Sequence, residues 1–456
     1  MSRYKYDKDE NKINSVLNYQ SVRLNEMNRN NLSSDFESDI LHSERILKDL
    51  GYDMPASKKL ENGIGQKVVM LPSWNEICTD AENRVGNACT LESLFSEREM
   101  KICEVEFRQI NKEFNELHRL DTIDISICAL ASIIGAAVDI LLVGIPTKTS
   151  DGIKAGTLAD FIRKEFEKRF PPEEMEKLAK SKSSKVPYDA QDNRNTTEYV
   201  EGLSAYYHRL LSLGHDPFLG FIVGVFDIMT GRMTTIDKSG KIVSQVMDNY
   251  SDRKESNIFK AIAKEFAHLK SDVTTSMGLP APLMSVFNLF QFGKIGDEEQ
   301  TIAEIVQGMY YEGYDFIHFC SLSIPVMIEE VIIRMGYALK RINEGYGIGD
   351  SIPASLDRCK HPKLATMLFT GHTGAAAINA GKVYFTKNPM AINYPQWLAF
   401  AKHSYKQLKW LLIEKPQMRY CYVEDILDSE LQQVIIEVDK CFDDCFKNYT
   451  VVIDDG

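Results

Sequence analysis

Apolar residues recur three and four positions apart along most of the chain, which is the spacing of helices with one buried face. The run TLESLFSEREMKICEVEFRQINKEFNELHRL predicts a long amphipathic helix that begins at Thr90, whose side-chain oxygen would cap it. One segment differs, because two β-branched runs in residues 232–246 flank Lys-Ser-Gly and predict a short hairpin. We therefore expect a mainly α protein, a multi-helical bundle with one short β-hairpin.

The most apolar segment is residues 125–145, in which Asp139 is the single charged residue. Its 21 residues would form a helix about 31 Å long, which is enough to cross the hydrocarbon core of a membrane. Gly144 followed by Pro146 predicts the end of this helix.

A second apolar helix is expected at residues 217–230. Asp216 is a favourable N-cap, and Pro217 is favourable at the first helical position. The helix would end before Gly231.

Both apolar helices carry small residues on one face, spaced four, three and four positions apart and including an aspartate. These stripes are Cys128, Ser132, Gly135 and Asp139 in the first helix, and Gly220, Gly224, Asp227 and Gly231 in the second. In a third segment, residues 371–381, His372 and Asn379 are seven positions apart and share a face. Small residues allow close approach, so we expect tightly packed helices with these polar groups near their seams.

The chain divides by pattern into three parts. Residues 1–92 are expected to form a polar N-terminal arm or cap, residues 93–394 a helical core with the hairpin, and residues 395–456 C-terminal helices. Within the core, the lysine-rich stretch 163–195 predicts two helices followed by an exposed loop. That loop is the best candidate for an internal linker.

Composition and charge exclude several classes of protein. The apolar fraction of 44% and the charged fraction of 26% are typical of a globular protein and argue against a polytopic membrane protein. A net charge of −12 disfavours nucleic acid as a partner, because phosphate binding needs a basic surface. Nine cysteines without a CxxC pair and an N-terminus without an apolar signal segment predict a cytoplasmic protein with reduced thiols.

A carboxylate on the packed face of a helix must be paired, protonated or bound to a cation, because an isolated buried charge is costly. In a structural interpretation, arginines neutralise Asp139 and Asp227. The candidate arginines are Arg119, Arg209 and Arg334. In a membrane interpretation, the stripes hold helices together in lipid and the aspartates line a polar seam. An aspartate in residues 125–145 costs about 3 kcal/mol on insertion scales, so conditional insertion fits better than constitutive spanning.

In a metal interpretation, a divalent transition metal ion such as Zn²⁺, Mn²⁺ or iron binds between the helices, and a water on it becomes the nucleophile. The candidate ligands are Asp139, His208, His215, Asp227 and His372. His208, His215 and Asp227 are also the candidate catalytic residues.

The run HRL at residues 208–210, followed by LGHDP, LG and finally DI at residues 227–228, resembles an uncharacterised family of bacterial proteins. This resemblance implies a bacterial origin and no activity. The HR and GH pairs also resemble those of histidine-rich membrane-bound hydrolases, but the further motif elements of those enzymes are missing.

Two functions follow from these patterns. The first is a non-enzymatic helical assembly or conditionally membrane-acting protein, at the inner face of the cell membrane, that uses residues 125–145 and 217–230. Its partners would be further copies of the chain or a membrane. The alternative is a metal-dependent hydrolase with a His/Asp site between the same helices.

Overall fold

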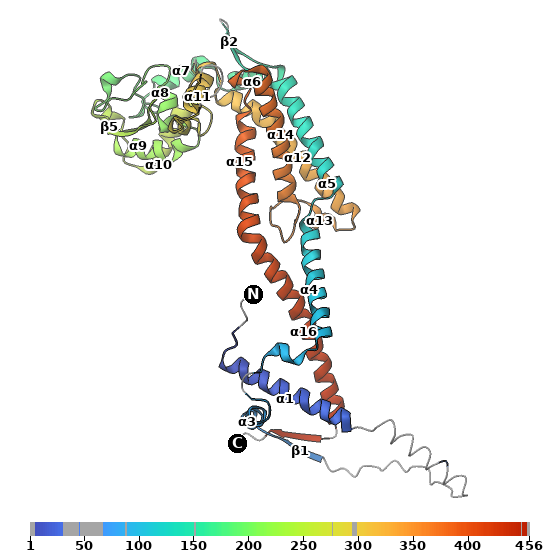
Figure 1. The fold of residues 1–456 in the computed structure, drawn as a ribbon. Helices are drawn as coiled ribbons and strands as arrows, with labels where there is room; N and C mark the ends of the chain where they lie inside the picture. Colours follow the sequence, from blue (N-terminus) through green and yellow to red (C-terminus); the bar gives the residue numbers. More distant parts are fainter. Residues whose placement is uncertain are drawn as a thin grey trace. The chain divides into compact units, whose positions relative to one another are not determined.

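The computed structural model describes residues 5–30, 45, 67–86, 89–149, 152–275, 277–293, 299–447 and 449–453. It confirms a mainly α protein (Figure 1). The chain divides into two compact units, one of Met1–Glu116 with Lys415–Gly456 and the other of Leu117–Glu414. The boundaries expected after residues 92 and 394 differ from this division.

The first unit contains helices at both ends of the chain. They are α1 (Lys8–Asn30), α3 (Trp74–Val85), α4 (Glu97–His118) and α16 (Lys415–Phe446). Val16 of α1 packs with Cys78 and Ala81 of α3 in a small core. Strand β1 (Lys67–Leu71) pairs in parallel with β6 (Tyr449–Ile453). The expected N-terminal arm is therefore folded in its described residues.

The long helix predicted from Thr90 begins later than expected. Thr90 makes no side-chain cap, and a short 3-10 helix at Leu91–Leu94 precedes α4. The amide of Glu99 donates to Ser96 Oγ at 3.3 Å, and the amide of Ser96 donates to Glu99 Oε2 at 2.7 Å. This reciprocal capping box fixes the start of α4.

The second unit contains a bundle of four long helices, seen side by side in Figure 1. They are α5 (Thr122–Val138, continued by a π-helical turn at Asp139–Val143), α12 (Phe316–Asn343), α14 (Leu364–Thr386) and α15 (Tyr394–Lys409). Both α5 and α15 pack against α12 and α14. Gly144 ends the first of these helices with φ 69°, as its sequence predicts.

Small residues bring the bundle helices close together, as predicted. Ser132 Oγ donates to the carbonyl of Gly371 at 2.8 Å, which joins α5 directly to the backbone of α14. A Cβ atom on Gly135 would lie 3.3 Å from the carbonyl oxygen of Pro325 on α12.

The predicted hairpin is also present. Strand β4 (Arg232–Ile236) pairs antiparallel with β5 (Ile242–Val246), and Thr234 lies opposite Ser244. The short pair β2 (Thr147–Thr149) and β3 (Gly152–Lys154) was not predicted.

The surroundings of the hairpin, residues 181–275, are called the hairpin region below. Helices α8 (His208–Leu211), α9 (Val223–Thr230) and α10 (Ile258–Asp272) lie in it. The second unit also contains α6 (Thr157–Arg169), α7 (Pro172–Lys180), α11 (Ile302–Tyr311) and α13 (Ile348–Ser351).

Two expectations for the hairpin region need correction. The helix expected at residues 217–230 is divided into a 3-10 turn at Leu219–Phe221 and α9, although Asp216 does cap it by accepting from the amides of Phe218 and Leu219. Glycines at two of its positions lower its helix propensity. The loop expected as an exposed linker instead runs through the core. Its buried residues are Ser184, Val186, Tyr188 and Ala190.

Candidate metal centre

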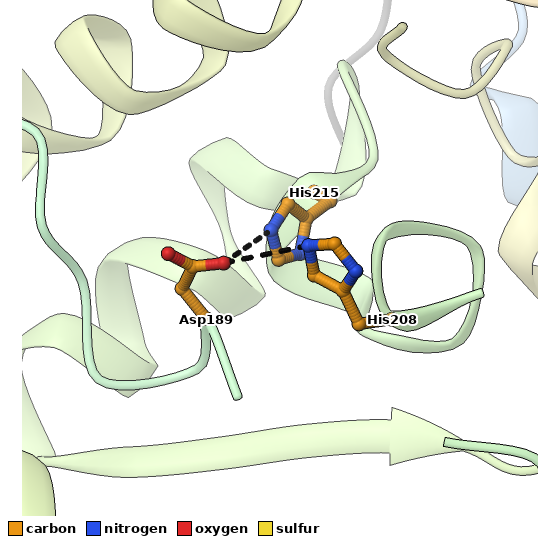
Figure 2. Close-up of side chains that lie close together, drawn as sticks. All are labelled: Asp189, His208 and His215. Atoms are coloured by element: carbon orange, nitrogen blue, oxygen red, sulfur yellow. Dashed lines mark ion pairs between the residues drawn. The ribbon is translucent and has the colours of Figure 1, made fainter. Parts of the chain in front are cut away.

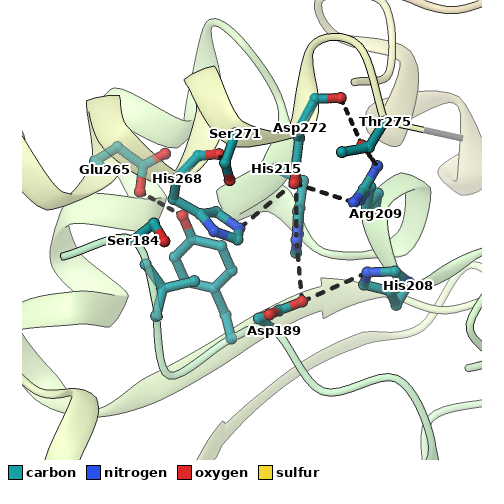
Figure 3. Close-up of polar contacts among 12 residues, drawn as sticks. Ser184, Asp189, His208, Arg209, His215, Glu265, His268, Ser271, Asp272 and Thr275 are labelled. Carbon is teal, nitrogen blue, oxygen red and sulfur yellow. Dashed lines mark hydrogen bonds and ion pairs between the residues drawn. The ribbon is translucent and has the colours of Figure 1, made fainter. Parts of the chain in front are cut away.

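Five potential metal ligands converge in the hairpin region. They are Asp189, His208, His215, His268 and Asp272. The elements that supply them are the buried loop after α7 for Asp189, α8 for His208, the 3-10 turn Leu213–His215 for His215, and α10 for His268 and Asp272. Figure 2 shows Asp189 directed toward the two histidines that precede α9, and Figure 3 adds the residues of α10.

The candidate ligand atoms form two overlapping groups that share His215, and the atoms within each group are spaced as around a cation. Asp189 Oδ1 lies 3.5 Å from His208 Nε2 and 3.8 Å from His215 Nε2. Asp272 Oδ2 lies 3.9 Å from His215 Nε2 and 3.8 Å from His268 Nε2. A tetrahedral ion with bonds of about 2.1 Å separates its ligands by about 3.4 Å. His215 Nε2 belongs to both sets of distances, so an ion bound in either group would have His215 as a ligand.

Most of these atoms lack hydrogen-bond partners among the residues that the structure describes. His208 Nε2, His268 Nε2, Asp272 Oδ2 and both ring nitrogens of His215 are buried without one. Leaving a buried polar atom unsatisfied costs about 1–3 kcal/mol, and native proteins rarely do so. Several such atoms within 4.8 Å of one another, as in each group, are the arrangement that a bound cation would satisfy.

Neighbouring groups orient the ligands. His208 Nδ1 lies 3.0 Å from the carbonyl oxygen of Ala205, so its N–H donates there and Nε2 presents its lone pair toward Asp189. Arg209 Nη2 lies 3.0 Å from Asp272 Oδ1, which leaves Oδ2 directed at the histidines (Figure 3). Arg209 is itself held by Thr275 Oγ1 at 2.7 Å.

Electrostatics favour the metal-binding protonation states of two of these residues, His215 and Asp189. Burial lowers the pKa of His215 to about 4, so its ring is neutral at pH 7. Burial opposes ionisation of Asp189, but the nearby imidazoles of His208 and His215 outweigh it and hold the pKa of this carboxyl well below its usual range. Asp189 is 27% exposed on its side chain, and therefore marks the solvent side of the cluster.

A buried carboxyl, Glu265, lies beside the cluster. Its Oε2 accepts a hydrogen bond from the hydroxyl of Tyr188, whose ring meets those of His215 and His268 edge-on. Burial raises the pKa of Glu265 well above its usual range. A Cβ atom on Gly224 would lie 2.6 Å from Glu265 Oε2, so the small-residue stripe of α9 makes room for this side chain.

We expect Gly224→Ala to destabilise the protein by about 1–3 kcal/mol, because the methyl group would collide with the buried Glu265 carboxyl. The midpoint of urea unfolding measures this effect. Gly308→Ala is the matched control, since Gly308 also lies in a helix but no atom lies within 4 Å of its added Cβ. The same urea midpoint for Gly224→Ala as for Gly308→Ala would contradict the close packing of Gly224.

The residues predicted as ligands do not lie together. His208 and His215 belong to the cluster, whereas Asp139 and His372 lie in the four-helix bundle. Asp227 accepts from the amide of Thr234 at 2.7 Å and from its hydroxyl at 2.8 Å, and thus ties α9 to β4. It is not among the grouped potential ligands.

Two of the three arginines expected to neutralise the aspartates have other partners. Arg209 pairs with Asp272, and Arg334 lies 3.5 Å from Glu330 on the same helix. Asp139 is instead paired with Lys382, whose Nζ lies 3.1 Å from its Oδ2.

Three of the candidate ligands, His268, Asp272 and Asp189, are not predicted by the sequence patterns. His268 and Asp272 are four residues apart on α10, a spacing that places two ligands on one helix face and could have been noticed. Asp189 follows no such pattern, because it lies in a polar stretch whose burial depends on distant residues.

The pH dependence of stability tests the environment of Asp227. Burial raises the pKa of its carboxyl to about 6 in the folded protein. As the pH rises from about 4 to 6, the unfolded chain loses this proton while the folded chain retains it, so the folded state loses stability. We expect the unfolding free energy of wild type, relative to Asp227→Asn, to fall by about 2 kcal/mol between pH 4 and pH 7.

Urea unfolding of both proteins at the two pH values gives this difference. Asp248→Asn, at an exposed position, provides the baseline. A wild-type to Asp227→Asn difference that is independent of pH would contradict the burial of an ionisable group at this position.

Neither models of known protein families nor curated proteins nor solved structures give a match to this chain.

Proposed function

We propose that this protein is a metal-dependent hydrolase with a divalent transition metal ion bound by the hairpin-region cluster. The observation that carries the proposal is the convergence of buried, unpartnered nitrogen and oxygen atoms from His208, His215, His268 and Asp272, with Asp189 on the solvent side.

The donor set indicates the kind of ion. Three imidazole nitrogens and two carboxylate oxygens suit Zn²⁺, Mn²⁺ or Fe²⁺, whereas a set of oxygens alone would favour Mg²⁺ or Ca²⁺. The ring of His215 is neutral, as a ligand must be, and Arg209 fixes the carboxylate of Asp272.

Hydrolysis is the reaction class that this arrangement favours. A divalent cation here would act as a Lewis acid and lower the pKa of a water molecule toward neutrality. The protein would contribute fixed ligand geometry and a dry interior, since His215 is fully buried. Asp189 is the most exposed of the ligands, so water and substrate would approach from its side.

A hydrolysis assay tests the proposal. We expect the Zn²⁺- or Mn²⁺-loaded protein to cleave a p-nitrophenyl phosphodiester or a p-nitroanilide, and to lose this activity with EDTA or in His215→Ala. Asp248→Asn, an exposed substitution, should retain it. Metal-loaded protein that is inactive on both substrates, or activity that survives His215→Ala, would contradict the hydrolase assignment.

We infer a second candidate function, membrane association, from the outer surface of the bundle. The exposed positions of α5 and its π-helical turn carry no charged residue, and neither do those of α12. The large exposed apolar side chains include Ile125, Leu130, Ile133 and Leu141 on the first, and Met327, Val331, Met335 and Leu339 on the second. Two helical stretches, Glu97–Val143 and Phe316–Asn343, are long and apolar enough to cross a bilayer by length and composition.

The charges of these helices face inward instead. Asp124 is fully buried, and its Oδ1 lies 2.7 Å from Lys340 Nζ. Asp139 is buried against Lys382. Helices in lipid expose apolar side chains and keep charged side chains paired in the interior. Helices of a water-exposed bundle have charged and polar side chains on their outer face instead.

Residues 217–230, the second segment expected to contact a membrane, also carry exposed apolar side chains. Phe218, Ile222 and Phe226 are exposed four residues apart, and α9 packs against α10, on which Phe259 and Phe266 are exposed. An apolar patch of this kind on a folded protein marks an interaction surface.

We expect Met335→Lys to weaken binding to phosphatidylcholine vesicles about 100-fold, since a lysine in a membrane-embedded helix costs about 3 kcal/mol. Vesicle flotation in high salt measures binding. Asn343→Lys, at the exposed end of the same helix, should bind like wild type. Equal binding of Met335→Lys and wild type, or no wild-type binding, would contradict a lipid contact through α12.

A further inference from the structure

A second group of potential metal ligands lies inside the four-helix bundle, away from the cluster described above. Glu330 comes from α12, His372 from α14 and His403 from α15, so three helices each contribute one side chain. Glu329, the neighbour of Glu330 along α12, is fully buried beside them.

The spacing of these side chains suits a shared cation. Glu330 Oε1 lies 3.7 Å from His372 Nε2 and 3.5 Å from His403 Nε2. The two imidazole rings are stacked, with centroids 4.7 Å apart and planes inclined by 22°. One ligand atom from each residue lies within 4.8 Å of the others, as around a bound metal ion.

Unpartnered buried atoms supply an independent observation. Within the described part of the chain, His372 Nε2 and His403 Nε2 are buried without a hydrogen-bond partner, and the two residues are 0% and 2% exposed. Both nitrogens are directed at Glu330, whose side chain is 27% exposed and gives an ion a route from the surface.

Surrounding groups orient His372. Glu329 Oε2 lies 3.1 Å from His372 Nδ1, where a carboxylate can hold the ring N–H and leave the Nε2 lone pair facing Glu330. The amide nitrogen of Gln396, Nε2, lies 3.1 Å from Nδ1 and donates to the backbone carbonyl of His372 at 3.3 Å. A carboxylate behind a ligand histidine is a common outer-shell arrangement in metal sites.

We propose that Glu330, His372 and His403 bind a second divalent transition metal ion within the bundle. Two imidazoles and a carboxylate are the donor set of many zinc sites, and three protein ligands leave further positions for water. This site shares no ligand with the hairpin-region cluster, so it does not depend on the proposed hydrolase.

Titration of the metal-free protein with Co²⁺, followed by visible absorption and calorimetry, tests the proposal. We expect two equivalents to bind to wild type, one to His403→Gln and one to His215→Ala. The double variant should bind none. His361→Gln, which replaces a buried histidine outside both groups, should keep two. Circular dichroism shows whether each variant is folded.

The outcomes separate the two sites. Loss of one equivalent in His403→Gln but none in His215→Ala would support the bundle site and contradict the hairpin-region site. Unchanged binding in a folded His403→Gln variant would overturn the bundle site and leave His372 as a protonated histidine bridging two glutamates. Glu330→Gln provides a second test if His403→Gln does not fold, and it too should lose one equivalent.

Discussion

Replacing His215 with alanine is expected to weaken metal binding in the hairpin region by more than about 100-fold. Changes to outer-shell partners alone cost about 10–100-fold in affinity, and His215 is an inner ligand candidate whose Nε2 faces both Asp189 and Asp272. Competition with a chromophoric chelator measures the affinity. The substitution also removes a fully buried ring, so the free energy of unfolding must be measured alongside.

His361→Ala is the control for this loss of buried ring volume. It is expected to lower stability through the same kind of cavity without changing metal affinity, because His361 packs against Tyr337 in the bundle, outside both ligand groups. If folded His215→Ala retained wild-type affinity, the cluster in the hairpin region would not be a metal site.

Replacing Lys382 with methionine is expected to destabilise the second unit by about 3–5 kcal/mol. Lys382 and Asp139 are both buried, and removal of one member of a buried ion pair leaves the other charge uncompensated. Asn379 Nδ2, at 3.4 Å from Asp139 Oδ2, is too weak a substitute for the ammonium group. The loss of helical circular dichroism in urea measures the change.

Two further variants isolate the ion pair. Asp139→Asn with Lys382→Met should recover most of the lost stability, because replacing both charges of a buried pair is often close to neutral. Lys387→Met, which removes an exposed lysine just after α14, should have little effect. A Lys382→Met protein as stable as Lys387→Met would show that Asp139 is not a buried charge that needs this partner.

The features that the sequence predicted correctly depend on local signals. The hairpin follows from β-branched residues on either side of a tight turn, and β4 and β5 pair across that turn. Gly144 ends the apolar helix because its backbone has a positive φ of 69°, a conformation that favours glycine. The start of α4 was also locally encoded, but in Ser96 and Glu99 rather than in Thr90.

The ligand set was harder to predict because it is assembled from residues far apart in the chain. The similar stripes that lead to Asp139 and Asp227 report helix packing, and a packed carboxylate can be satisfied by Lys382 or by Thr234 as well as by a metal. Asp189 becomes a ligand candidate only because its loop is buried in the hairpin region. Such burial is set by tertiary packing and leaves no periodic signal.

His372 illustrates a prediction that was informative without being complete. Its place on a small-residue helix indicated a buried polar group, and it is fully buried. The side chains around it come from α12 and α15, however, and not from the segments that carry the other predicted ligands. The sequence therefore identified a polar position in the bundle but not its partners.

Elemental analysis of the purified protein, after incubation with Zn²⁺, Mn²⁺ or Fe²⁺ and removal of free ions, tests the hairpin-region site most directly when wild type and His215→Ala are measured together. We expect one equivalent of metal per chain to be present in wild type and lost in His215→Ala, whatever the bundle site retains. Equal metal content in the two proteins, or no metal in either, would contradict a metal centre at Asp189, His208, His215, His268 and Asp272.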